Sequence, residues 1–96
     1  MNVRYTDTAL GEIDEICSHI AHDNPTAATD VAAAIERTVA LIAERPESAP
    51  VVHAGDVRGR LVRGFQFRIF YVTDGHEVIV RNVRRTKRAR PWEREQ

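Results

Sequence analysis

Residues 64–84 read GFQFRIFYVTDGHEVIVRNVR, in which two runs rich in aromatic and β-branched residues flank Asp74-Gly75. A two-residue Asp-Gly between such runs is one of the strongest local signals for a β-hairpin, because a type I′ turn needs a positive φ at both central positions. We therefore expect two antiparallel strands joined at this dipeptide.

The expected turn also sets the pairing of the two strands. A two-residue loop here pairs Thr73 with His76 and, farther from the turn, Arg68 with Arg81. Side chains alternate across a strand, so one face is expected to carry Phe67, Ile69, Tyr71, Val78 and Val80. The opposite face is expected to carry Arg68, Phe70, Val72, Ile79, Arg81 and Val83. The first set is typical of a core, whereas the second places two opposed arginines among apolar side chains, which an anion and an apolar partner would stabilise.

The composition indicates a globular protein. The chain has 96 residues, of which 43% are hydrophobic, and a chain of this length forms one domain with a single core. We therefore predict one domain over residues 1–96. The only cysteine, Cys17, excludes an intramolecular disulfide framework, and no apolar run approaches the roughly 18 residues of a membrane span. The prediction is a cytoplasmic protein with no membrane partner.

The net charge of zero conceals a division between the two halves of the chain. Residues 1–50 contain three arginines and nine acidic residues, whereas residues 51–96 contain eleven basic and five acidic residues. This split suggests that the C-terminal half binds an anionic partner. The alternative is that the acidic and basic halves attract each other.

Two helices are expected after a short edge strand at residues 2–6. Thr6 is a suitable N-cap for a helix that ends near Asp23, and Asn24-Pro25 predicts the start of a second helix that ends near Glu44. The first apolar stripe contains Leu10, Ile13, Ile16, Cys17 and Ile20, with Glu12 facing outward. The second contains Ala28, Val31, Ala32, Ile35, Val39 and Ile42. The alanines of the second helix favour close packing as an antiparallel helical hairpin.

The remaining segments complete an α+β order of β-α-α-β-β-β. Residues 46–56 have the composition of a loop, and residues 57–63 are expected to form a strand before the hairpin. The fold prediction is an N-terminal edge strand, a helical hairpin and a three-stranded antiparallel sheet. Residues 84–96 are predicted to form a basic tail, too polar for a core.

Most candidate sites have a simpler structural explanation. His19 and His22 lie three residues apart, but two ligands fall short of a zinc site, so we predict no metal and no cofactor. Cys17 lies on an apolar stripe and is expected to be a buried small hydrophobe. Phosphate-binding glycine loops are absent from the sequence.

The basic residues of the C-terminal half carry the most information. Thirteen of the fourteen basic residues in the chain are arginines, which pair with phosphates and carboxylates but do not act as bases. RNA cleavage without a metal needs a titratable group. The candidates are Tyr71, His76, Glu77 and Lys87. Tyr71 is expected in the core, while His76 and Glu77 lie at the turn, so the sequence favours binding over catalysis and leaves the catalytic residues unknown.

The sequence resembles the RelE/ParE superfamily of bacterial toxins. The resemblance rests on the element order, Asn24-Pro25 at the second helix, residues 64–71 (GFQFRIFY) and residues 78–81 (VIVR). It implies the toxin of a type II toxin-antitoxin pair, which is held inactive by a cognate antitoxin. RelE-like members cut mRNA on the ribosome, commonly with a Tyr or His near the C-terminus, whereas ParE-like members poison DNA gyrase and lack that set. Here the position after the last expected strand is Arg84, which favours the ParE-like branch.

We therefore predict that the protein is a toxin that acts as a ParE-like poison of DNA gyrase. The alternatives are a ribosome-dependent mRNA endoribonuclease and a non-toxic domain that binds nucleic acid or a partner. The residues predicted to bind the target or nucleic acid are Arg60, Arg63, Arg68, Arg81, Arg84, Arg85, Lys87 and Arg88. Those predicted to bind the antitoxin are Phe70, Val72, Ile79 and Val83.

Overall fold

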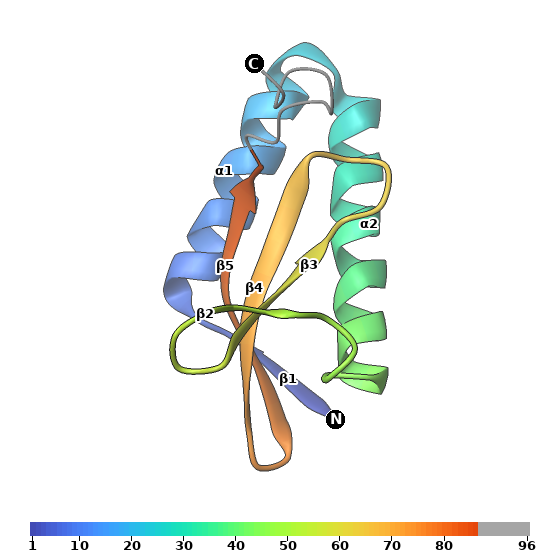
Figure 1. The fold of residues 1–96 in the computed structure, drawn as a ribbon. Helices are drawn as coiled ribbons and strands as arrows, with labels where there is room; N and C mark the ends of the chain where they lie inside the picture. Colours follow the sequence, from blue (N-terminus) through green and yellow to red (C-terminus); the bar gives the residue numbers. More distant parts are fainter. Residues whose placement is uncertain (87–96) are drawn as a thin grey trace, which may run out of the picture.

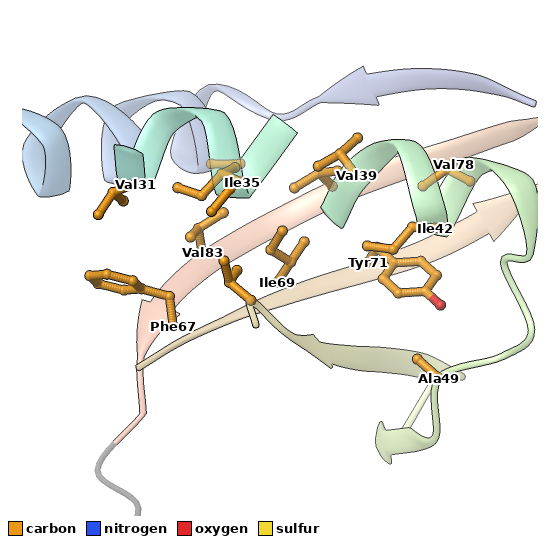
Figure 2. Close-up of a cluster of buried hydrophobic side chains, with 14 residues drawn as sticks. Val31, Ile35, Val39, Ile42, Ala49, Phe67, Ile69, Tyr71, Val78 and Val83 are labelled. Carbon is orange, nitrogen blue, oxygen red and sulfur yellow. The ribbon is translucent and has the colours of Figure 1, made fainter. Parts of the chain in front are cut away.

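The computed structural model describes residues 1–86, which form one mixed sheet and two helices (Figure 1). The elements are β1 (Asn2–Tyr5), α1 (Asp7–Asp23), α2 (Pro25–Glu44), β2 (Val51–His53), β3 (Val57–Leu61), β4 (Phe67–Asp74) and β5 (Glu77–Arg85). Both helices lie on the same side of the sheet, so within residues 1–86 its other side is free of helices (Figures 1 and 2). No helix in this part of the chain is long and apolar enough to cross a membrane.

The ends of both helices agree with the prediction, because each begins at a residue that caps it. The Thr6 hydroxyl accepts a hydrogen bond from the Ala9 amide at 3.0 Å, and the Asn24 side-chain oxygen accepts one from the Ala27 amide at 3.0 Å. These bonds satisfy amides that have no partner within the helix. Local sequence was therefore sufficient to place both helices.

The sheet has five strands in the order β1-β5-β4-β3-β2, not the expected edge strand beside a three-stranded antiparallel sheet. The N-terminal strand lies at an edge as predicted and pairs in parallel with β5. The segment predicted as a loop contains β2, which pairs with β3 through an irregular register. The predicted strand at residues 57–63 is confirmed as β3, which ends at Leu61.

The hairpin is confirmed, but its predicted register is wrong. Asp74 pairs with Glu77, so the loop consists of Gly75 and His76. Gly75 has a φ of +62° and His76 has no positive φ, which fits a type II′ turn with glycine first. A second irregularity follows, because Phe70 pairs with Asn82 while Tyr71 pairs with Val80, which leaves the intervening residue as a bulge.

These two shifts change which side chains face each other. Arg68 lies opposite Arg84 instead of Arg81, the bulged residue. Val83 turns into the core, where it is 1% exposed. The predicted place of Val83 on the arginine-bearing face is therefore wrong. Arg84 and Arg85 belong to β5, so the prediction that they lie in a tail is wrong, and the Thr86 amide donates a hydrogen bond to the Gln66 carbonyl at 2.9 Å. Residues 87–96 of the predicted tail lie outside the described residues.

The core lies between the helices and the sheet (Figure 2). The predicted core residues of β4 and β5 are all buried, and Tyr71 donates a hydrogen bond from its hydroxyl to the Pro46 carbonyl at 2.6 Å. Two residues of the predicted helical stripes, Leu10 and Ala32, are exposed instead. The predicted stripes therefore identify the side of each helix that faces the core, but not which residues at the border of a stripe are buried.

Candidate partner-binding and anion-binding surfaces

The helix-free face of the sheet is shaped by a glycine in β3. A Cβ atom on Gly59 would lie 3.0 Å from Arg68 Cδ, 3.1 Å from Val52 Cγ2 and 3.4 Å from Phe70 Cε1. The missing side chain thus lets Arg68 and Phe70 of β4 and Val52 of β2 converge over β3. This approach brings β2 over the sheet, so that His53 contacts Phe70 with ring centroids 5.6 Å apart.

A small pocket opens beside these two rings. It has a volume of 330 Å³ and is lined by His53, Ala54, Val57, Phe70, Arg81, Asn82 and Arg84. We call it the His53 pocket. In the part of the chain that the structure describes, its charged residues are arginines only, and its histidine comes from the segment that the sequence predicted as a loop. A pocket of this composition is suited to an anion that carries an apolar or aromatic group.

The predicted basic residues of this face differ in their surroundings. Arg68 is half-buried, and its Nε is buried without a hydrogen-bond partner in residues 1–86. Arg81 is exposed, and its side chain forms no hydrogen bond or ion pair within this same part of the chain, although its carbonyl accepts a hydrogen bond from the Thr6 hydroxyl at 3.0 Å. The Arg84 Nε lies 3.3 Å from Glu12 Oε2 on α1. Arg85 lies on the other side of the sheet, with its guanidinium carbon 5.1 Å from the centroid of the Phe67 ring.

Glu12 also holds the free edge of β5 beyond the end of β1. Its Oε1 accepts hydrogen bonds from the Val83 amide at 2.9 Å and from Asn82 Nδ2 at 3.3 Å. The prediction that Glu12 faces outward is wrong. The carboxylate instead supplies the hydrogen-bond acceptor that a neighbouring strand would otherwise provide for the Val83 amide. Its contacts with Asn82 and Arg84 orient these two polar residues, which line the His53 pocket.

Two of the predicted arginines lie on a different surface. Arg60 and Arg63 line a groove of 720 Å³ between α2 and β3, which we call the α2–β3 groove. Its lining residues are Ala34, Arg37, Thr38, Leu41, Arg60, Leu61 and Arg63. The structure therefore divides the predicted basic set: Arg60 and Arg63 lie at this groove, Arg68, Arg81 and Arg84 on the helix-free face, and Arg85 beside Phe67. The last two predicted members, Lys87 and Arg88, lie outside the described residues.

The α2–β3 groove exposes apolar side chains that the sequence did not single out. Leu41 is 48% exposed and Leu61 is 38% exposed. On the helix-free face, by comparison, Phe70, Val72 and Ile79 are each half-buried. A solvent-exposed leucine pair beside arginines is a candidate contact surface for a protein partner.

The remaining titratable candidates offer little chemistry. Burial raises the pKa of the Tyr71 hydroxyl, although Arg58 and Arg60 act in the opposite direction. Burial also raises the pKa of the Cys17 thiol, and Asp14 adds to this effect, so the reactive thiolate is disfavoured. Among residues 1–86, no group of three or more His, Cys, Asp and Glu side chains is placed to hold a metal ion.

Sequence reasoning missed His53, Glu12 and the exposed leucines for one shared reason. Their roles arise from contacts between elements that are distant in the chain, such as β2 with β4 or α1 with β5. One usable signal was Gly59 inside a predicted strand, since a glycine at such a position often marks a close approach of other groups.

Comparisons with known proteins agree with this architecture. A solved chain titled as the chromosomal ParDE TA system from P. aeruginosa superposes with a TM-score of 0.80 at 18% identity, covering 91% of this chain and 97% of that one. The isolated E. coli RelE toxin gives a TM-score of 0.66 at 15% identity, covering 98% and 93%. At these identities the likeness shows a shared fold.

The sequence itself matches no curated protein. It does match the family model for the ParE toxin of the type II toxin-antitoxin system parDE, over residues 3–90. That match covers nearly the whole chain. The chain therefore belongs to the ParE toxin family of type II toxin-antitoxin systems.

Proposed function

We propose that this chain poisons DNA gyrase and that its antitoxin neutralises it by occupying the α2–β3 groove. Membership of the ParE toxin family implies a cognate antitoxin. The gyrase target is supported by the same membership, because the ParE-like branch is the one that acts on gyrase. The observation that supports the groove is its pair of exposed leucines, flanked by three arginines.

The shape of the groove favours a segment that lies along α2. Ala34, Arg37, Thr38 and Leu41 recur at three and four residues, so they form one stripe of the helix surface. Leu61 of β3 forms the opposite wall. An amphipathic segment laid in such a groove buries its apolar anchors between the two elements.

The charge of the groove defines the chemistry of that segment. Arg37, Arg60 and Arg63 line it, and within residues 1–86 no acidic residue does so. Arg60 donates a hydrogen bond to the Ser48 hydroxyl at 2.8 Å, which holds its guanidinium near the groove. We therefore expect an antitoxin segment with apolar anchors and with carboxylates at its edges, because complementary charges fix register and exclude wrong partners.

Calorimetric titration of the antitoxin into variants of the toxin tests this placement. Leu41→Ala and Leu61→Ala should each weaken the complex by about 30-fold, because truncated anchors in a packed interface typically cost about 2 kcal/mol. Leu10→Ala is the matched control, since Leu10 is a leucine on α1 that is 51% exposed. Losses at Phe70→Ala with no change at Leu41→Ala and Leu61→Ala would move the antitoxin to the helix-free face.

The target is tested with purified toxin from which the antitoxin has been removed. The toxin should inhibit supercoiling by gyrase and cause cleaved DNA to accumulate, and addition of antitoxin should restore supercoiling. In a parallel reaction, mRNA on programmed ribosomes should stay intact. Unchanged gyrase activity at toxin concentrations that arrest growth would refute the gyrase target.

A ribosome-dependent endoribonuclease is the second candidate, and one observation favours it. His53 lines the same pocket as Arg81 and Arg84, so this surface holds a titratable side chain beside groups that can stabilise a charged phosphate. Codon-positioned mRNA cuts that disappear in His53→Ala and Arg81→Ala, with gyrase unaffected, would establish this candidate instead.

A further inference from the structure

We propose that the His53 pocket binds a phosphodiester group of a single-stranded nucleic acid, with the adjoining base against Phe70. The proposal concerns binding only. It does not depend on whether gyrase or the ribosome is the target, or on where the antitoxin lies.

The cationic side of the pocket has unused hydrogen-bond donors. The Arg81 guanidinium forms no hydrogen bond or ion pair within residues 1–86, and the Arg84 guanidinium uses only its Nε there, in the contact with Glu12. The terminal nitrogens of both guanidinium groups are therefore available to an oxyanion. Guanidinium groups bind phosphate oxygens through paired N–H donors.

Two features favour an anion over a neutral ligand. Among the described residues, none that lines the pocket is acidic. Arg68 and Arg84 also lie directly opposite each other on β4 and β5, and like charges in such a pair repel. Arg68 is not among the lining residues, but a phosphate bound at Arg84 would weaken that repulsion, whereas an uncharged ligand would leave it unchanged.

The aromatic side of the pocket favours a nucleotide over a simple anion. The rings of Phe70 and His53 lie 5.6 Å apart and are tilted by 39°, so they form a wall beside the arginines and not a closed stack. Stacking of a base on an aromatic side chain is a common source of affinity for single strands. A base that stacks here must be unpaired, so a duplex would not present it.

The size of the pocket also limits the size of the group that it can bind. Its volume of 330 Å³ is near the lower end of the range of about 300–1,000 Å³ for small-ligand sites. That space suits one nucleotide. Gly59 maintains it indirectly, because the close approach of Val52 and Phe70 over this glycine positions His53.

Fluorescence anisotropy of antitoxin-free toxin tests the proposal with labelled oligothymidine and oligouridine of equal length, at low ionic strength. Arg81→Ala should lower the affinity about tenfold, as expected for the loss of a hydrogen-bonded charge. The slope of log affinity against log salt concentration should fall by about 0.7, the value for one phosphate contact in a single strand. Phe70→Leu, which keeps an apolar side chain, should lower the affinity severalfold without changing the salt slope.

Arg45→Ala is the matched control, because it removes the same charge from an exposed position at the end of α2. An equal loss in Arg45→Ala and Arg81→Ala would overturn the pocket and leave only an effect of net charge. Tight binding of a duplex that is insensitive to Phe70→Leu would overturn the stacked base. Preference for the DNA or the RNA strand would identify the source of the phosphodiester, and failure of both strands to bind would refute the proposal.

Discussion

Replacement of Glu12 by alanine should destabilise the fold more than the same replacement at any other acidic residue of α1. The carboxylate accepts hydrogen bonds from the Val83 amide at 2.9 Å, Asn82 Nδ2 at 3.3 Å and Arg84 Nε at 3.3 Å. Removal leaves the edge amide of Val83 without a partner. A partly buried donor that loses its acceptor costs about 1–3 kcal/mol.

The ion pair adds little to this sum. The Arg84 side chain is 63% exposed, and exposed pairs contribute about 0–1 kcal/mol. We therefore expect Glu12→Ala to lower the free energy of unfolding by about 2 kcal/mol. For a chain of this size, this corresponds to a fall in Tm of about 10 °C. Glu12→Gln keeps an acceptor and should lose only about half as much.

Thermal and urea unfolding of three variants would measure the effect. Glu15→Ala is the control, because it makes the same substitution about one helical turn away, at an exposed position of the same helix. It should change the free energy of unfolding by less than about 0.5 kcal/mol. Equal stability of Glu12→Ala and Glu15→Ala would refute the claim that Glu12 stabilises the free edge of β5.

Three further predictions follow from single contacts. Tyr71→Phe removes the hydroxyl that donates to Pro46 and should lower the free energy of unfolding, measured in urea, by about 1 kcal/mol. The stability of the wild type should fall as the pH rises above about 10, because burial raises the pKa of Tyr71 in the folded state and the tyrosine of the unfolded chain therefore ionises first. An equally steep fall in Tyr71→Phe would contradict this explanation. Gly75→Ala should cost about 1 kcal/mol, because its φ is +62°, whereas an unchanged Tm would contradict the type II′ turn. Gly59→Ala should cost about 1 kcal/mol or more by overpacking against Arg68 and Val52 and should shift the NMR resonances of the Phe70 ring, while a spectrum identical to the wild type would contradict the close approach.

The predictable parts of the fold depend on local chemistry. Thr6 and Asn24 cap their helices with their own side chains, so the caps could be predicted from neighbouring residues alone. The alternation from Phe67 to Tyr71 placed the core side of β4 correctly, because it depends only on the geometry of one strand.

The hairpin register could not be predicted in the same way. Asp74-Gly75 and Gly75-His76 are both acceptable two-residue turns, and the difference moves every pair along the ladder. The bulge at Arg81 then reverses the alternation, so that Val83 enters the core. The bulge lies where Thr6, the N-cap of α1, donates a hydrogen bond to the Arg81 carbonyl and where Glu12 of α1 accepts one from the Val83 amide. No local pattern could have indicated these contacts.

The candidate site was predicted only in part. The sequence identified arginines as its main chemistry, but the sheet places Arg81 on one surface and Arg60 on another. His53 reaches the first surface only because β2 crosses over Gly59. Leu41 lies at the second because of what packs beside α2, and helical periodicity does not specify that neighbour.

Methyl NMR with toxin that is labelled at the leucine, valine and isoleucine methyl groups and otherwise deuterated tests most directly where the antitoxin lies. The chain contains only three leucines, at positions 10, 41 and 61, so the methyl groups of two leucines report on the α2–β3 groove and those of the third report on α1. Saturation of protonated antitoxin in the complex should attenuate the methyl signals of Leu41 and Leu61 and leave those of Leu10 unchanged. Attenuation at Leu10, or at the labelled methyl groups of Val72 and Ile79 with both groove leucines unaffected, would contradict the account.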